Sequence, residues 1–361
     1  MDIELIKNTI IKDSPNFFKQ RLINLIVENG IGTYKFKQEP NLIQLKNKSI
    51  NEKIKECIDK EPLTIKMIDL LEINKGYRYS AVFEYDKLDM ASIQTKCIDI
   101  NSEYYKEIGA SIDELEKLYL EDDKQVFIKF HKKISILEKG DNPTWYDVRY
   151  PIIIIFHKDL KLLEVRFDRI NTDKEKGYYK IAIETCLSWL STNASLKYKY
   201  INLDGIIRYI IDSPEELAKE LIWAGELQKS QGITLKAGED MTMPFFDQLK
   251  IEIKKWKQEY KDKQEAINCL NEVEDYLNKT KKYANDKFRT LRVIKYKKDG
   301  KYILLDEPID LKITFNYGET LLDLINIYDN ELNDMERINY VIEIIGGVRK
   351  SIKELQNKIN R

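Results

Sequence analysis

The sequence predicts an α+β protein, with helices and a mixed β-sheet in its N-terminal two-thirds and a small antiparallel sheet flanked by long helices at its C-terminus. The first part is predicted by amphipathic helical segments that alternate with apolar runs such as PIIIIF (151–156), which are typical of strands covered on both faces. The second part is predicted by two long apolar seams of coiled-coil spacing, which bracket a hairpin signal.

The length of 361 residues is enough for two or three domains. We expect an N-terminal mixed α/β region over 1–110, an α/β domain over 111–243 with central strands across 145–168, and a third region over 244–361 that begins after a linker. Basic and acidic residues nearly cancel, at 60 against 61, so any electrostatic function must come from local clustering.

Several absences limit the class of protein. The four cysteines stand far apart and only two histidines accompany them, so we expect no zinc site. The opening MDIELIKNTIIKD has no basic start followed by an apolar stretch, and the longest apolar run is far too short to cross a membrane. We therefore expect a cytoplasmic protein without membrane contact, and the abundance of Ile, Lys and Asn is typical of an AT-rich bacterial genome.

The N-terminal and middle elements follow from capping signals and periodicity. Ser14-Pro15 opens a helix that ends at Gly30, and a capping box at 111–114 opens another. The remaining predictions are a helix near 50–58, a strand over 77–88, a helix with Phe127, Phe130, Ile134 and Leu137 along one face, strands in 145–156 and 161–170, a helix over 178–190, a helix opened by the capping box at 213–216 and reaching about 228, and a strand at the start of 232–244. Glu164, Arg166 and Asp168 share one strand face and predict an ion-pair ladder, and the four tryptophans are expected in the core.

The last third has the clearest pattern. The stretch between Pro244 and Gly300 contains no Gly or Pro, and its apolar residues follow a 4-3 spacing. This pattern predicts one helix of roughly 40 residues across 245–288. Asp299-Gly300 predicts a type I′ hairpin, followed by a third strand at 308–317 and a helix after Gly318. A seam across 334–360 predicts a second long helix. We expect the two long helices to pack on each other, or to bind a protein partner or a second copy.

Segment 278–302 is the most unbalanced in charge, with ten lysines and arginines against two acids. Lysine can hold a phosphate backbone and tyrosine can stack on a base. Pairing across the turn sets Lys298 opposite Lys301, and like charges directly opposite repel unless an anion lies between them. The candidate nucleic-acid-binding residues are Lys281, Lys282, Lys287, Arg289, Lys295, Lys297, Lys298, Lys301 and Tyr302. The alternative is a solvated helix end and a protected sheet edge.

The order helix, three strands, helix across 245–333 resembles the core order of the PD-(D/E)xK nuclease superfamily, and Asp310-Leu311-Lys312 has the form of its D-x-K element. This resemblance implies that Asp310 would hold Mg²⁺ with a second carboxylate from Asp299 or Asp306, and that Lys312 would orient the attacking water. No other metal or cofactor is expected, because the glycine-rich nucleotide loops and the GxSxG motif are absent from the sequence.

These observations lead to one expected function and two alternatives. We expect a non-enzymatic, nucleic-acid-associated binding or assembly subunit, a description that accessory proteins of mobile elements or phage-defence systems would fit. The first alternative is the Mg²⁺-dependent nuclease, and the second is a protein–protein scaffold without nucleic-acid contact.

Overall fold

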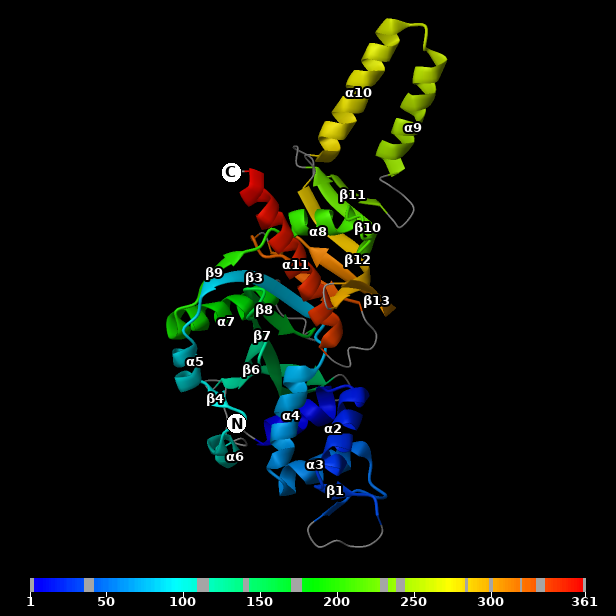
Figure 1. The fold of residues 1–361 in the computed structure, drawn as a ribbon. Helices are drawn as coiled ribbons and strands as arrows, with labels where there is room; N and C mark the ends of the chain where they lie inside the picture. The colour runs from blue at the N-terminus through cyan, green and yellow to red at the C-terminus, as the bar shows by residue number, and fades with distance from the viewer. Residues whose placement is uncertain are drawn as a thin grey trace. The chain divides into compact units, whose positions relative to one another are not determined.

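The computed structural model is shown in Figure 1, and it describes residues 3–35, 42–108, 117–138, 143–169, 177–227, 233–237, 244–282, 285–298, 301–318, 320–328 and 335–359. The chain divides into two compact units, the first formed by Met1–Ile201 with Asn330–Asn339 and the second by Asn202–Asp329 with Tyr340–Arg361. The protein is α+β, as the sequence predicts.

The helices of the first unit come mainly from its N-terminal third. They are α1 (Ile3–Asn8), the π-helical segment η1 (Thr9–Asp13), α2 (Asn16–Glu28), α3 (Ile50–Lys60), α4 (Leu63–Asn74), α5 (Met90–Lys96), α6 (Glu103–Ile108) and α7 (Tyr178–Ala194). A capping box opens α3, in which the Ser49 amide donates to Glu52 Oε2 at 2.7 Å and the Glu52 amide donates to Ser49 Oγ at 3.3 Å. The predicted helix opened at 111–114 lies outside the described residues.

The first unit is built on a mixed sheet with the strand order β4-β5-β6-β7-β8-β3, and β9 also pairs with β3. The strands are β3 (Tyr79–Lys87), β4 (Ile98–Asp99), β5 (Leu118–Glu121), β6 (Gln125–Glu138), β7 (Thr144–His157), β8 (Leu162–Phe167) and β9 (Lys197–Tyr200), and the short β1 (Gly32–Thr33) and β2 (Ile43–Gln44) pair separately. The β4–β5 pair is parallel and the other pairs of this sheet are antiparallel. The apolar run of β7 is buried throughout, as expected of a strand covered on both faces.

Helices cover both faces of this sheet. On one face, α4 lies over β6, where its acidic side chains contact Lys129. On the other face, the ring of Trp189 from α7 meets Phe130 of β6 at 5.4 Å between centroids. The β6–β7 pair therefore lies at the centre of the unit, and four of its polar side chains, Lys129, His131, Arg149 and His157, are buried there.

The helix expected along Phe127 to Leu137 is wrong, because these residues belong to β6. This strand pairs with β7 over its full length, from Gln125 opposite His157 to Glu138 opposite Thr144. The continuous antiparallel ladder satisfies the backbone of both strands, which is a tertiary interaction that the spacing of apolar residues does not report.

The second unit contains an antiparallel sheet with the order β11-β10-β12-β13-β14. Its elements are α8 (Leu203–Ile211), β10 (Ala218–Leu227), β11 (Ile233–Ala237), α9 (Pro244–Glu259), α10 (Gln264–Lys282), β12 (Asn285–Lys298), β13 (Lys301–Thr314), β14 (Leu324–Ile327) and α11 (Glu336–Ile359), whose first residues belong to the first unit. A tight apolar contact joins α8 and α11 to the sheet, and it is lined by Ile207, Ile210, Leu291, Val293, Leu311, Ile313, Val341, Ile344 and Ile345.

The units do not follow the expected limits of 110 and 243. Parallel pairing of Ile98 with Leu118 joins segments on the two sides of the first limit. Pairing of β10 with β12, such as Ala218 with Val293, joins segments on the two sides of the second. Long-range strand pairing places the division after Ile201 instead.

Two more helices expected from local signals are strands. The capping box at 213–216 is followed by β10, because Glu216 has a φ of +51° and turns the chain away from a helix. The helix expected after Gly318 is β14, which follows a turn closed by the Tyr317 amide on the Leu322 carbonyl. The expected third strand at 308–317 continues β13 after a break in its register with β12 between Val293 and Lys295.

The single helix expected across 245–288 is also wrong, because the chain turns between α9 and α10. The Lys263 amide donates to the Tyr260 carbonyl at 2.9 Å in this turn, and the two helices then run side by side (Figure 1). Ile253 and Leu277 are buried, and Lys257 Nζ lies 2.5 Å from Glu274 Oε2. Folding back lets each half of the seam cover the other, and no Gly or Pro is needed to turn the chain. The α11 seam packs its first half on the sheet of the second unit.

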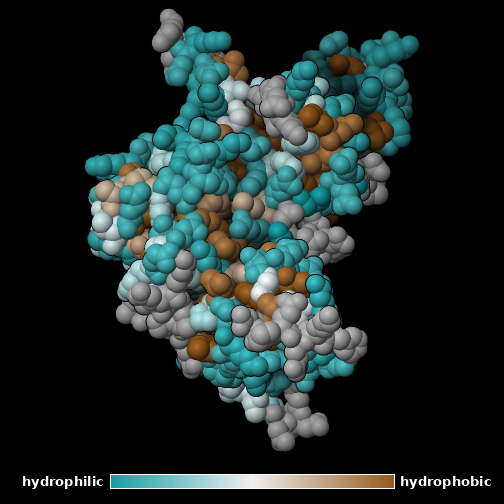
Figure 2. Space-filling model, turned by 60° about the horizontal axis from the view of Figure 1, so that its bottom comes forward, coloured by the Kyte–Doolittle hydropathy of each residue, from teal (hydrophilic) through white to brown (hydrophobic). Residues whose placement is uncertain are grey.

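Several large apolar side chains reach the surface. On the face drawn in Figure 2, hydrophobic residues gather in patches among hydrophilic ones. Trp145 and Trp256 are exposed, so the prediction that all four tryptophans lie in the core is wrong for these two. No helix in the described part of the chain is both long and apolar enough to span a membrane.

Candidate nucleic-acid interface and a buried charge cluster

The β12–β13 hairpin has the register that the sequence predicts near its turn. Lys298 pairs with Lys301, Lys297 with Tyr302, and Lys295 with Leu304. The turn residues, Asp299 and Gly300, lie outside the described residues. The tip of the hairpin therefore sets two lysines directly opposite each other, which is an unfavourable arrangement for an isolated strand pair.

Two of the candidate cations are engaged within the protein. Arg289 is almost fully buried, and its Nη1 donates to Glu220 Oε1 at 2.5 Å. Lys295 Nζ donates to the backbone carbonyl of Glu215 at 2.5 Å. An ion pair and a backbone contact therefore compete with any phosphate for these two residues.

The other candidates divide into exposed residues and residues whose side chains lie outside the described part. Lys287 and Lys301 are exposed, and Tyr302 is 40% exposed. The side chains of Lys281, Lys282, Lys297 and Lys298 lie outside the description, although their backbones continue α10 and β12. The structure thus brings Lys301 and Tyr302 to the accessible tip and turns Arg289 away from it.

The two residues of the nuclease alternative also have partners. Arg292 donates from Nε and Nη2 to the two carboxylate oxygens of Asp310 at 2.8 and 2.9 Å, directly across the β12–β13 ladder. Lys312 Nζ lies 3.9 Å from the centre of the Phe288 ring. Within the described residues, the one group of side chains close enough to hold a metal lies elsewhere, so the Mg²⁺ site remains a prediction.

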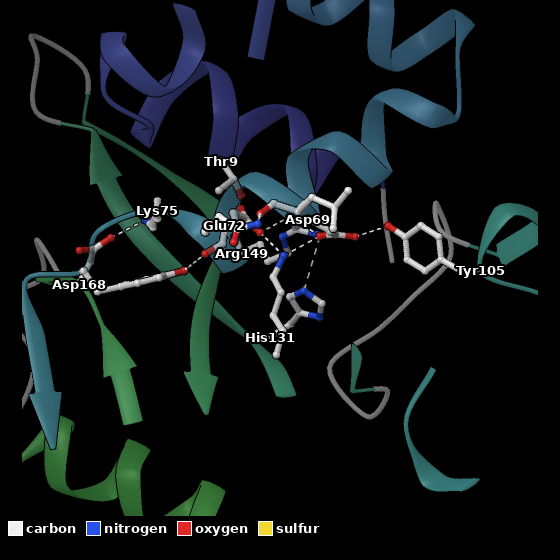
Figure 3. Close-up of polar contacts among 12 residues, drawn as sticks. Thr9, Asp69, Glu72, Lys75, Tyr105, His131, Arg149 and Asp168 are labelled. Carbon is white, nitrogen blue, oxygen red and sulfur yellow. Dashed lines mark hydrogen bonds and ion pairs between the residues drawn. The ribbon is translucent and has the colours of Figure 1, made fainter. Parts of the chain in front are cut away.

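That group belongs to a cluster of charged residues buried in the first unit (Figure 3). Asp69 and Glu72 lie one turn apart on α4, Lys129 and His131 lie on one face of β6, and Arg149 lies on β7. All five are buried, with Asp69 and Lys129 fully removed from water. Residues three apart on a helix, or two apart on a strand, lie on the same face of that element. The charged side chains of α4 and of β6 therefore meet in the layer between the helix and the sheet.

The buried cluster is closely hydrogen-bonded. Lys129 Nζ donates to Asp69 Oδ1 at 2.6 Å and also to Glu72. Arg149 Nη2 donates to Glu72 Oε2 at 2.6 Å and lies 3.0 Å from Asp69 Oδ1. Tyr105 donates its hydroxyl hydrogen to Asp69 from the far side, as Figure 3 shows. Each carboxylate therefore has two cationic partners.

Burial and charge act in opposite directions on these groups. Burial alone raises the pKa of Asp69, but the Lys129 and Arg149 charges outweigh it and hold the pKa well below its usual value. Glu72 has a lowered pKa for the same reasons. Burial lowers the pKa of His131 far below its usual value, and the nearby cations lower it further, so the imidazole is neutral. Both carboxylates are thus ionised and both cations are paired.

The cluster does not fit a metal ion. Asp69, Glu72 and His131 offer ligand atoms within 4.8 Å of one another, and the two imidazole nitrogens of His131 have no hydrogen-bond partner in the described part of the chain. However, Lys129 and Arg149 already balance the two carboxylates, so a divalent ion would add two uncompensated positive charges to a buried site. The arrangement joins α4 to β6 and β7.

A second buried network involves the strand residues predicted as an ion-pair ladder. Arg166 donates from Nε and Nη2 to the two oxygens of Glu164 at 2.8 and 2.7 Å, and Ser80 and His157 also contact this carboxylate. Burial raises the pKa of Glu164, but Arg166 and His157 bring it to about 2. Asp168 pairs instead with Lys75 of the segment after α4. The ladder therefore forms only between Glu164 and Arg166.

The sequence carried a signal for the buried cluster that the apolar pattern concealed. Lys129 and His131 alternate with apolar residues, and Arg149 precedes the longest apolar run of the chain. Charged residues inside such segments are buried only when they are paired. The residues of opposite charge are Asp69 and Glu72, which lie three residues apart in the segment that forms α4.

Comparison with known proteins finds no family model, no curated protein and no solved structure that matches this chain. Inference about function therefore starts from the residues of the chain itself.

Proposed function

We propose that the chain is a non-enzymatic cytoplasmic binding protein that holds the phosphate backbone of a nucleic acid at the tip of its β12–β13 hairpin. The observation that carries the proposal is the register of this hairpin. The paired positions 295–298 and 301–304 contain four lysines, two tyrosines and two aliphatic residues, and no acid.

The proposal rests on the electrostatics of the tip. Lys298 and Lys301 face each other, and Lys297 is the next residue along the strand. A bound anion reduces the repulsion between these like charges. The free protein loses this unfavourable interaction on binding, and this increases its affinity for a phosphate. Tyr302 lies across from Lys297 with 40% of its surface exposed, where its ring can stack on an unpaired base. We therefore expect an affinity that falls as the salt concentration rises and that depends little on the nucleotide sequence.

Binding is tested by fluorescence anisotropy with labelled single-stranded DNA, duplex DNA and RNA of random sequence over a series of salt concentrations. The test variant is Lys298→Glu/Lys301→Glu, and the matched control is Lys254→Glu/Lys261→Glu, which reverses two exposed lysines of α9 and the turn after it. Removing one lysine–phosphate interaction reduces the steepness of log K against log salt by about 0.9 for duplex and about 0.7 for single strands.

We expect the tip variant to bind all sequences more weakly and to have a smaller salt slope, while the control keeps both. Equal affinity of the tip variant and the unaltered chain would exclude the hairpin as the binding site. Absence of binding at low salt to any of the three nucleic acids would exclude the function.

A further inference from the structure

Exposed apolar side chains lie among the lysines at the tip of the β12–β13 hairpin. Tyr302 and Ile303 are each 40% exposed, and Leu304 is 66% exposed. Successive residues of a strand point to opposite faces, so Tyr302 and Leu304 share one face. Phosphates are held by polar and charged groups and use none of this apolar surface. A ligand that matches the whole tip therefore offers apolar surface as well as negative charge.

A second tyrosine lies beside Tyr302. Burial raises the pKa of the Tyr302 hydroxyl, and the nearby Glu215 and Tyr209 raise it further. Both residues therefore lie close to that hydroxyl. Tyr209 comes from α8 and is 41% exposed. Two half-exposed aromatic side chains from different elements thus lie near each other beside the tip.

The charges around the two tyrosines differ from one side to the other. Lys301 directly precedes Tyr302, is exposed, and lies opposite Lys298. Glu215 is exposed on the other side, and a hydrogen bond from Ser213 lowers its pKa, so it is negatively charged at neutral pH. A phosphate is attracted to the lysines and repelled by Glu215. The backbone of a nucleic acid is therefore directed to the lysines, and its bases to the tyrosines.

Neighbouring elements limit how the hairpin can approach a duplex. Lys295 and Tyr296 point to opposite faces of the two-stranded ribbon. Lys295 contacts the Glu215 carbonyl, and the Tyr296 ring centre lies 4.5 Å from that of Tyr340 on α11. Only the last two paired positions of the hairpin lie beyond these contacts. A ribbon reads a duplex by lying along the major groove, which is about 12 Å wide, and the contacts on both faces keep all but the tip of this ribbon out of it.

We propose that the hairpin tip binds single-stranded nucleic acid in preference to duplex, with Tyr302 and Tyr209 stacking on unpaired bases while the lysines at 298 and 301 hold the phosphates. This inference rests on the proposed function and adds the class of its ligand and a residue from α8. The faces of paired bases are covered by their neighbours in a duplex, whereas a single strand leaves them open to aromatic side chains. DNA and RNA strands both offer this surface.

The test is fluorescence anisotropy of the full chain with three labelled oligonucleotides of equal length, prepared as DNA and as RNA. They are a single strand, the same strand with its bases replaced by abasic sites, and the duplex. The test variant is Tyr209→Leu/Tyr302→Leu, and Tyr209→Phe/Tyr302→Phe keeps the rings. The matched control is Tyr104→Leu, which removes a tyrosine of α6 that is 57% exposed. Circular dichroism confirms that each variant folds.

The unaltered chain should bind the single strand at least about fivefold more tightly than the abasic strand, and should prefer it to the duplex. The leucine variant should lose this factor for the single strand only and keep the salt slope, because the phosphate contacts remain. The phenylalanine variant and the control should bind like the unaltered chain.

Two kinds of failure are distinguishable. If the duplex or the abasic strand binds as tightly as the single strand, or if the leucine variant keeps full affinity, the inference is overturned and the phosphate site at the lysines stands. If none of the oligonucleotides binds at low salt, the proposed function fails and the inference fails with it.

Discussion

Replacing Lys129 with Met tests the role of the buried charge cluster. The substitution keeps most of the side-chain volume but removes the cation that donates to both Asp69 and Glu72. Arg149 then faces two buried carboxylates alone, so one negative charge has no balancing partner. The folded protein must either keep this charge in a site without water or protonate it.

The size of the effect follows from burial. Removing one partner of a buried ion pair costs about 3–5 kcal/mol of unfolding free energy. Asp69 keeps Tyr105 and Arg149 as donors, so we expect a value near the lower end, about 3 kcal/mol. Lys133 on the same strand makes a solvent-exposed pair with Asp147 at 2.7 Å, and Lys133→Met should cost no more than about 1 kcal/mol.

The two variants are compared by urea unfolding, with hydrogen exchange of the β6 and β7 amides to report on the first unit. The lowered pKa values of Asp69 and Glu72 mean that the stability they contribute is present above their ordinary values of 3.8 and 4.5 and is lost as the pH falls through the lowered values. In Lys129→Met the carboxyl pKa values rise. The deficit should therefore be largest near neutral pH and shrink toward pH 4.5 and below. A deficit no larger than that of Lys133→Met would refute the assignment of the cluster as an interaction that stabilises the fold.

Two further predictions concern single residues. Burial raises the pKa of the Cys57 thiol to about 11 and those of Cys97 and Cys186 to about 12, whereas Cys269 is exposed. A thiol reagent at neutral pH should therefore label Cys269 first, and the other three cysteines only after unfolding. Labelling of Cys57 in the native chain at the rate of Cys269 would contradict the described burial. Asp310→Ala breaks a half-exposed pair with Arg292 and should cost no more than about 1 kcal/mol. Under the proposed binding function, incubation of DNA or RNA with Mg²⁺ and the unaltered chain gives no products, whereas Mg²⁺-dependent cleavage that Asp310→Ala abolishes would establish the nuclease alternative.

Capping residues, apolar spacing and turn dipeptides predicted the elements that depend mainly on interactions between residues close in the sequence. The Ser14-Pro15 start and the heptad spacing after Asn333 gave α2 and α11 nearly to the residue, and the Asp299-Gly300 signal gave the register of the hairpin. The turn between α9 and α10 could not be predicted in the same way. A seam that continues without Gly or Pro is compatible with one long helix or with two shorter helices packed on each other, and only the burial of Ile253 and Leu277 between the helices decides.

The failure at β6 and the failure to find the charge cluster have one physical cause. Val126, Ile128 and Phe130 face one helical layer and Phe127, Lys129 and His131 face the other, so both faces of the strand are buried. A strand buried on one face alternates between apolar and polar residues, but this strand has charged residues among its buried ones. Because Lys129 and His131 interrupt the apolar run, the remaining apolar residues fall at helical spacing by coincidence. The acids that make Lys129 stable in the interior lie 57 and 60 residues away on α4. Charged residues whose partners lie that far apart in the sequence can be recognised as pairs only when the two elements are known to be in contact. Lys129 and His131 therefore obscured both the prediction of the strand and the prediction of the charge cluster to which they belong.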